Sequence, residues 1–509
     1  MTRKKYRPWQ VDQSFLLPPS MKDWLPEGHL AWFIREVVEQ LDLSTIDAAL
    51  QSKDPRGNRP FDPRMMVALL LYGWCVGVRS SRAIARLTWN DVAFRVLAGD
   101  QHPVYSTLIH FRADHADALA GLFVQVLEIA RKAGLVALHH VAVDGTKVQA
   151  AASKHKAMSY GRMRVARKKL EDEVSAILAE AERVDQEEDA LYGTDNNGDV
   201  VPEELRRRET RLARIKQAMA ELEEEARLAR AEDLRALAAN NREKAETQDD
   251  PAERGRADKR ATKQQEQADE LDPPDDEPPS SDVADLPLFQ TATGLPKHKP
   301  KRTPAGKPKP KAQRNFTDPD SRIMERGGAF LQGYNCQLAV DAAHQVIVAH
   351  GVTNLAPDNG NLVPMLRLTR ENTGQSPTHV TADSGYWADD VESRCRELGT
   401  EAWVATGRLK HGSQHPPTDN PIPDDLTPRP RMKARLNTTE GRALYKRRKA
   451  IVEPVNGQIK DARGLRRFLR RGLEAVSQDW ALEATCHNLM KVYRYGWQDP
   501  DPDPDPATG

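Results

Sequence analysis

The sequence predicts an α/β protein in which a mixed β-sheet is flanked by helices, with an all-helical region before it and a long charged insertion within it. Three observations support this. Apolar residues recur at helical spacing between about residues 26 and 134. Short β-branched runs, separated by helical patterns, begin at residue 139 and resume after residue 318. Between these runs, residues 161–315 are rich in Arg, Lys, Glu, Ala and Pro.

Length and composition set limits on the class of protein. With 509 residues the chain is long enough for two or three domains. Lys+Arg and Asp+Glu both number 75, so the net charge indicates no polyanionic partner, but the charges are segregated in blocks. The four cysteines are far apart, which argues against a zinc finger and a disulfide scaffold and fits a reducing compartment. No apolar run reaches membrane-spanning length, so we expect a cytoplasmic protein without a membrane partner.

Residues 1–136 are expected to form an N-terminal helical domain. The segments PEGHLAWFIREVVEQLDL and FDPRMMVALLLYGWCVGV both have the apolar spacing of helices. Two shorter helices, SRAIARL and DVAFRVLAG, follow with Ser and Asp or Asn available as N-caps. In outline this pair resembles a helix-turn-helix, and plain helix packing is the alternative.

Residues 137–160 and 316–496 are expected to form the sheet domain. The run HHVAVDGTKVQAAA predicts a first strand, and GAFLQGYNCQLAVDAAHQVIVAHGVT predicts a β-hairpin. A helix, the strand THVTADSGYW, a second helix and the strand EAWVATG come next, followed by a basic helix over 439–461 and a last helix over 475–494. This order is the connectivity of the RNase H-like fold.

The insertion is expected to have two parts. Residues 161–246 predict two helices around the turn GTDNNGD, arranged as an antiparallel coiled hairpin. Residues 247–315 predict a disordered linker, first acidic (DELDPPDDEPPSSD) and then Lys/Pro-rich (LPKHKPKRTPAGKPKPKAQR). Residues 497–509 predict a disordered acidic tail.

Three carboxylates lie where the chemistry of such a sheet is expected. Asp144 is expected to end the first strand, in VAVDGT, Asp383 ends the strand in VTADSGYW, and Glu453 lies on the basic helix. Ligand sites of α/β sheets form at the carboxyl ends of strands. Three hard oxygen ligands without a Cys/His motif suit Mg²⁺ or Mn²⁺, and two such ions can support phosphoryl transfer. The alternative is that Asp144 and Asp383 only form turns.

The helix around Glu453 is strongly basic. Between residues 441 and 471 the only acidic residues are Glu453 and Asp461, against eleven Lys and Arg residues. Cations can hold a phosphate backbone while a carboxylate holds a metal, which suits a nucleic-acid site. The alternative is a solvated basic helix in which Glu453 is merely ion-paired.

At these residues the sequence resembles the DDE transposases of bacterial insertion sequences. That clan carries a Y-(2)-R-(3)-E-(6)-K signature, and Tyr445, Arg448, Glu453 and Lys460 match it except that four residues separate Arg448 from Glu453. Lys449 has the expected spacing to the glutamate, so the choice between Arg448 and Lys449 as the phosphate-contacting cation stays open. The segments DGTKVQAAASKHKAMSYGRM, ADSGYW and FDPRMMVALLLYGWCVGVRSSRAIARL also look like the family.

The resemblance implies a transposase that binds double-stranded DNA at the ends of its element. It implies metal-dependent strand cleavage and strand transfer by Asp144, Asp383 and Glu453 with two Mg²⁺ or Mn²⁺ ions, on DNA held by a homo-oligomer. Residues 1–136 would bind the DNA ends, and His155 in SKHK could contact the scissile phosphate. The alternatives are an inactive or domesticated DNA-binding relative and an RNase H-like nuclease without strand transfer.

Overall fold

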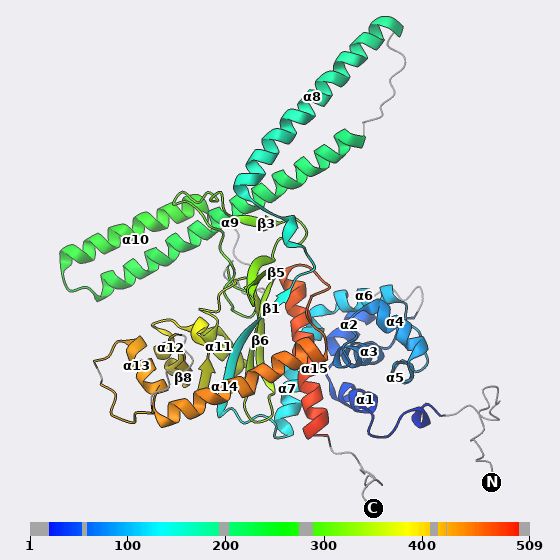
Figure 1. Ribbon diagram of the computed structural model, residues 1–509, viewed down its shortest axis with the longest axis vertical. Helices are drawn as coiled ribbons and strands as arrows, with labels where there is room; N and C mark the ends of the chain where they lie inside the picture. Colours follow the sequence, from blue (N-terminus) through cyan, green and yellow to red (C-terminus); the bar gives the residue numbers. More distant parts are fainter. Residues whose placement is uncertain are drawn as a thin grey trace, which may run out of the picture.

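A six-stranded mixed sheet forms the centre of the molecule (Figure 1). The computed structural model describes residues 20–52, 59–192, 203–273, 289–407, 416–423 and 425–497. The strand order is β4-β5-β1-β7-β8, and β6 pairs with β5. Strand β1 is antiparallel to β5 and parallel to β7, which is parallel to β8. The strands are β1 (His140–Gln149), β4 (Arg322–Arg326), β5 (Ala329–Asp341), β6 (Ile347–Thr353), β7 (His379–Ala382) and β8 (Glu401–Val404).

The chain order confirms the predicted fold class. After β1 come the hairpin β5–β6, then α11 (Leu362–Thr373), β7, α12 (Val391–Glu397), β8 and, after α13 (Pro428–Leu436), α14 (Thr439–Gly457). Strand β4 was not predicted. It joins β5 through Gly327 and Gly328, whose φ angles of 57° and 79° suit the tight turn between two antiparallel strands.

The helices before β1 share one hydrophobic core with the sheet. The last helix, α15 (Leu473–Tyr495), packs along α3, α7 and β6, and so joins the N-terminal helices to the sheet (Figure 1). Within the described ranges no helix has the length and apolarity needed to cross a membrane. The N-terminal helices are α1 (Leu30–Gln40), α2 (Ser44–Gln51), α3 (Pro63–Cys75), α4 (Ser81–Asn90), α5 (Val92–Leu97), α6 (Tyr105–Asp114) and α7 (Ala116–Lys132).

Buried ion pairs fix α15 to the N-terminal helices. The Glu483 carboxylate, fully buried, accepts hydrogen bonds from Arg79 (2.9 Å) and Arg463 (2.6 Å). Asp479 is paired with Arg112 in the same way. Charges removed from water are tolerated only when they are paired. These pairs therefore hold the helices in one relative position.

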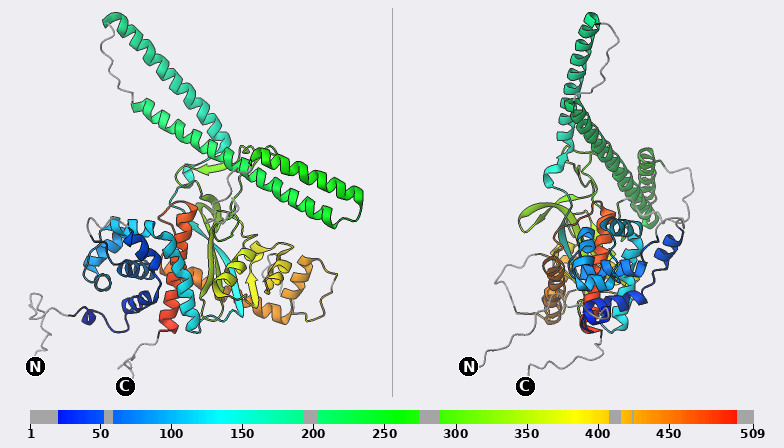
Figure 2. Two further views of the ribbon diagram at one scale, coloured as in Figure 1. Left: turned by 180° about the vertical axis from the view of Figure 1, so that it is seen from behind. Right: turned by 90° about the vertical axis from the view of Figure 1, so that its right-hand side faces the viewer.

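The described residues of the insertion form three helices, where two were predicted. The predicted helices are present as α8 (Tyr160–Tyr192) and α9 (Glu203–Thr247), which pack at their base through an apolar cluster around Met163 and Ile215. Helix α9 then continues past α8 and pairs with α10 (Pro251–Leu271) (Figures 1 and 2). The predicted turn GTDNNGD and the acidic tail from residue 498 lie outside the described residues.

The predicted disorder of residues 247–315 is wrong for its described parts. Asp250 caps α10 by accepting from the Ala252 N–H (3.0 Å), and Pro251 occupies the first turn. Ala261 and Ala268 are fully buried at a seven-residue spacing on α10, which packs against α9. Composition predicted disorder because α10 is highly charged, but small residues on one face let two charged helices pack closely. The acidic residues 274–288 lie outside the described part of the chain.

Two short elements connect β1 to the insertion. After β1, a 3-10 turn (η2, Lys154–Lys156) leads into β2 (Ala157–Ser159), which pairs with β3 (Gln313–Asn315). We call β2 and β3 together the neck, because they join the start and the end of the insertion.

Candidate active site

Asp144 and Asp383 come from neighbouring parallel strands. Strands β1 and β7 are in register from His140 opposite His379 to Ala142 opposite Thr381. Extending that register by two residues puts Asp144 opposite Asp383. Asp383 also caps a 3-10 turn, η3 (Ser384–Tyr386), by accepting from the Gly385 N–H at 2.8 Å. Asp383 thus lies at a turn, but Asp144 does not end its strand as predicted, because β1 continues to Gln149 and Asp144 pairs with Leu338 of β5. The register of the two parallel strands, and not a pair of turns, puts the carboxylates at the same level of the sheet.

The environment of Asp144 disfavours its negative charge. The pKa of Asp144 is raised to about 6, mainly by burial; Arg448 lowers it, and the neighbouring carboxylates of Asp383 and Asp358 raise it. The Arg448 guanidinium is 3.9 Å from Oδ1 of Asp144, and Asn456 donates to Oδ2 at 3.3 Å. Asp144 is therefore a buried carboxylate whose negative charge is only partly compensated by its surroundings.

Helix α14 crosses β1, β5 and β7, and places Arg448 and Lys449 differently. The Arg448 side chain is 10% exposed and reaches both Asp144 and the Tyr445 ring, whose centroid is 5.8 Å from the guanidinium. Lys449 points into solvent. Of the two cations that the signature left open, Arg448 is the one beside Asp144.

Glu453 lies on α14 but is separate from the two aspartates. Its side chain is exposed, and within the described ranges no hydrogen bond or ion pair joins it to Asp144 or Asp383. Glu453 lies three positions before Asn456, which contacts Asp144, so both lie on one helix face. The structure therefore brings two of the three predicted carboxylates together and leaves the third on the neighbouring helix surface.

The end of α14 is irregular, for a local reason. Pro454 has no N–H to donate to the carbonyl of Ala450, and the Gln345 side-chain amide donates to that carbonyl instead (3.0 Å). A π-helical turn, η4 (Gln458–Ala462), follows. It carries Lys460, which donates to the Thr146 hydroxyl two residues after Asp144. Lys460 thus lies beside the site, as its place in the signature implied.

His155 is not part of this cluster. It lies exposed in η2, beyond the end of β1, between Lys154 and Lys156. The described contacts of this segment are with the neck, not with Asp144 or Asp383.

The structure adds one carboxylate that sequence reasoning missed. Asp358, in the loop between β6 and α11, accepts from Lys147 (3.1 Å), Asn335 (2.7 Å) and Gln337 (2.9 Å). It packs so closely against the residue after Asp144 that a Cβ at Gly145 would lie 2.4 Å from the Asp358 carboxylate. Asp358 also adds to the negative charge at Asp144. Its Asp-Asn-Gly context reads as an ordinary turn, and only the tertiary fold reveals its position.

The same loop supports the second aspartate. A Cβ at Gly385, two residues after Asp383, would lie 3.6 Å from Asp358. The buried Tyr386 hydroxyl donates to Gln337, which in turn donates to Asp358. Gly145 therefore allows the backbone beside Asp144 to approach this polar network closely, whereas a Cβ at Gly385 would make only an ordinary van der Waals contact with it.

Comparison with known protein families agrees with this geometry. Residues 19–114 match a family described as "Transposase domain (DUF772)", and residues 424–493 match one described as "Transposase DDE domain". Two separate parts of the chain are therefore similar to transposase domains, the second of them to a DDE domain. The first match covers α1 to α6, and the second covers α14, with Glu453 and Lys460, and most of α15. A search of curated proteins gave no significant match, and neither did a search of solved structures.

The donor set of this site suits a hard divalent cation. Carboxylate oxygens are the preferred protein ligands of Mg²⁺ and Mn²⁺, and a cation would stabilise the charged form of the buried Asp144. Within the described ranges no group of three or more His, Cys, Asp or Glu side chains is arranged to hold a metal ion. The carboxylates of Asp144, Asp383 and Glu453 are the type of ligand that such an ion prefers. Asp144 and Asp383 lie together, and Glu453 is exposed on the surface of α14.

Proposed function

We propose that this protein is a transposase that binds the ends of its element and catalyses metal-dependent strand cleavage followed by strand transfer. The transposase domains already indicate a role in transposition. The observation that supports the chemistry is the position of Asp144 and Asp383 at the same level of the sheet, beneath a basic helix. The proposed active site consists of these two residues and Glu453.

Each residue has a proposed task. Asp144, Asp383 and Glu453 hold the metal, which when bound activates the attacking oxygen and stabilises the leaving oxygen of an in-line displacement. Arg448 keeps the Asp144 carboxylate oriented and partly balances its charge. Asn456 orients the second oxygen of the same carboxylate. Lys460, whose pKa is lowered mainly by burial, lies close enough to contact a phosphate beside Thr146.

DNA binding is assigned to cations that surround these carboxylates. Lys449 is exposed on the carboxylate-bearing helix, and Lys460 extends from η4. Cations at such positions bind phosphates and fix the register of the duplex without reading its sequence. Sequence recognition is assigned to the N-terminal helices, and a homo-oligomer on DNA is part of the same proposal.

The test is an end-cleavage assay with Mg²⁺ on a labelled duplex that carries the terminal repeat of the element. Asp144→Asn and Asp383→Asn should each lower the cleavage rate by at least about a thousandfold, since several kcal/mol of transition-state stabilisation is lost. Binding of the same duplex should persist. The matched control is Asp461→Asn, which neutralises an exposed carboxylate on η4 and should cleave normally.

The assay also separates the competing functions. Joining of the released 3′ end to a second duplex would support strand transfer, and cleavage without joining would indicate a nuclease. A wild-type protein that binds ends but never cleaves would indicate an inactive DNA-binding relative. Full cleavage by either aspartate variant would remove that residue from the proposed site.

A further inference from the structure

The Lys/Pro-rich segment of the insertion contains an ordered internal repeat. The pattern Thr-x-x-Gly-x-Pro-Lys occurs at Thr291–Lys297 and again at Thr303–Lys309. In both copies the Thr N–H donates to the carbonyl four residues later at 2.8 Å, and the Thr hydroxyl accepts from that residue's N–H at 3.0 and 3.1 Å. Both glycines are left-handed, with φ of 71° and 75°. The segment is thus two copies of one turn.

One set of cations in this segment fastens it to α9. Lys299 pairs with Asp233 (3.2 Å), Arg302 pairs with the same carboxylate, and Arg314 pairs with Glu221 (2.6 Å). No carboxylate occurs within residues 296–314, so these cations have to find acidic partners on another element. The charge of the anchoring set is therefore balanced by α9.

A second set of cations is left over. Lys301, Lys307, Lys309 and Lys311 are all exposed, and in the described part of the chain none of them forms an ion pair. The Lys309 N–H donates to the carbonyl of Lys301 at 2.8 Å, which brings these two lysines together across the turn. We call these four residues the lysine cluster. It concentrates four positive charges that no neighbouring carboxylate balances.

The lysine cluster lies on the neck. The Tyr160 N–H donates to the carbonyl of Ala312 (2.7 Å), and the Gly161 N–H donates to that of Pro310 (3.0 Å). The exposed Lys154 and Lys156 precede β2 on the same neck. The neck follows β1, the strand that carries Asp144, after residues 150–156, which include η2. Five residues of β1, or about 17 Å of extended chain, separate Asp144 from the end of this strand.

We propose that the lysine cluster, with Lys154 and Lys156, binds the phosphate backbone of the DNA duplex whose end is held at Asp144. This inference rests on the proposed function, because it takes the scissile phosphate to lie at that residue. A duplex that follows β1 from Asp144 reaches the neck within about one helical turn, or roughly 34 Å. Lysines at this position hold the duplex through counterion release and carry no sequence information.

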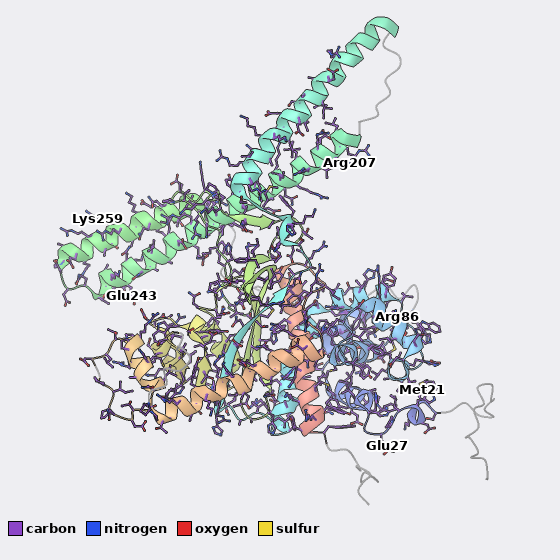
Figure 3. The ribbon with its side chains drawn as sticks, in the orientation of Figure 1. Met21, Glu27, Arg86, Arg207, Glu243 and Lys259 are labelled. Atoms are coloured by element: carbon purple, nitrogen blue, oxygen red, sulfur yellow. The ribbon has the colours of Figure 1, made fainter. Side chains whose placement is uncertain are left out.

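The experiment compares two triple variants in binding to a duplex that carries the terminal repeat, without divalent metal. Lys307→Gln, Lys309→Gln and Lys311→Gln together remove three charges of the cluster. Arg256→Gln, Lys259→Gln and Arg260→Gln remove three exposed charges from α10, on which Figure 3 labels Lys259. The substituted lysines have no ion-pair partners within the described chain, so the cluster variant should fold, and circular dichroism checks this.

The slope of log K against log[salt] is the readout. Each lost phosphate contact lowers its magnitude by about 0.9, so the cluster variant should lose roughly two to three units and the α10 variant close to none. A cluster variant with the wild-type slope and affinity overturns the inference, as does an equal loss in the α10 variant. A third outcome is a wild-type protein that fails to cleave DNA in the end-cleavage assay while the cluster variant still shows the reduced salt slope. That result would support DNA binding by the lysine cluster and would contradict the proposed strand cleavage.

Discussion

The pKa of Asp144 leads to a prediction about the stability of the metal-free protein. The folded pKa is about 6, against 3.8 for a free carboxyl, mainly because of burial and secondly because of nearby charges. A group whose pKa is raised in the folded state stabilises the protein below its unfolded pKa, and that contribution is lost as the pH rises through the folded pKa. The ionised Asp144 should therefore lower the free energy of unfolding above about pH 6.

The size of this effect follows from the shift. A rise of about two pKa units corresponds to about 3 kcal/mol, at 1.36 kcal/mol per unit. The pKa of about 6 already includes the lowering effect of Arg448, which is smaller than the raising effect of burial. Asp144→Asn keeps the shape of the neutral side chain and carries no charge at any pH. The variant should therefore be more stable than the wild type by up to about 3 kcal/mol at about pH 8.

The assay is urea unfolding, followed by circular dichroism, from about pH 4 to about pH 8 in the presence of a chelator. The advantage of Asp144→Asn should be small at about pH 4, grow between about pH 4 and about pH 6, and level off above about pH 6. Excess Mg²⁺ should stabilise the wild type and leave the variant almost unchanged. Asp461→Asn is the control, because that carboxylate is 68% exposed and its charge stays in water. An Asp144→Asn variant that is no more stable than the wild type at about pH 8 would refute the reasoning.

Three further predictions concern neighbouring residues. Glu453→Gln should lose cleavage while retaining end binding and the wild-type free energy of unfolding, since its side chain is exposed; a large loss of stability would indicate a structural role instead. Arg448→Ala should lower both stability and cleavage, because it removes the buried cation beside Asp144, whereas Lys449→Ala should only weaken duplex binding and flatten the salt slope by about one unit; identical phenotypes would contradict this division. Glu483→Ala should cost about 3–5 kcal/mol in urea unfolding, because it leaves Arg79 and Arg463 buried without their carboxylate; a cost under about 1 kcal/mol would show that these arginines find other partners.

The sequence was sufficient for features that depend on local pattern. Apolar β-branched runs predicted the strands of the sheet other than β4, and the polar residue after an apolar run located Asp144 and Asp383. Strand order followed because connections between consecutive elements are short and parallel strands need a crossover helix. The density of positive charge around Glu453 likewise needs no tertiary information.

Tertiary structure decided features that depend on which residues face one another. Arg448 and Lys449 are equivalent by composition, and only the packing of α14 against β1 directs Arg448 to Asp144. Asp358 looks like a turn residue until the loop after β6 brings it against Gly145. Disorder was wrongly predicted for α10 from its high charge. Its packing depends on buried alanines, which the average hydropathy of the segment does not reveal.

The lysine cluster shows most directly what the sequence alone does not determine, namely which cations form ion pairs. The sequence established that residues 296–314 carry many cations and no carboxylate. Which cations are balanced depended on the position of α9, since an ion pair forms only where the fold brings opposite charges within about 4 Å. Local sequence determines the elements and their charge, and the fold determines which charges are left for a partner.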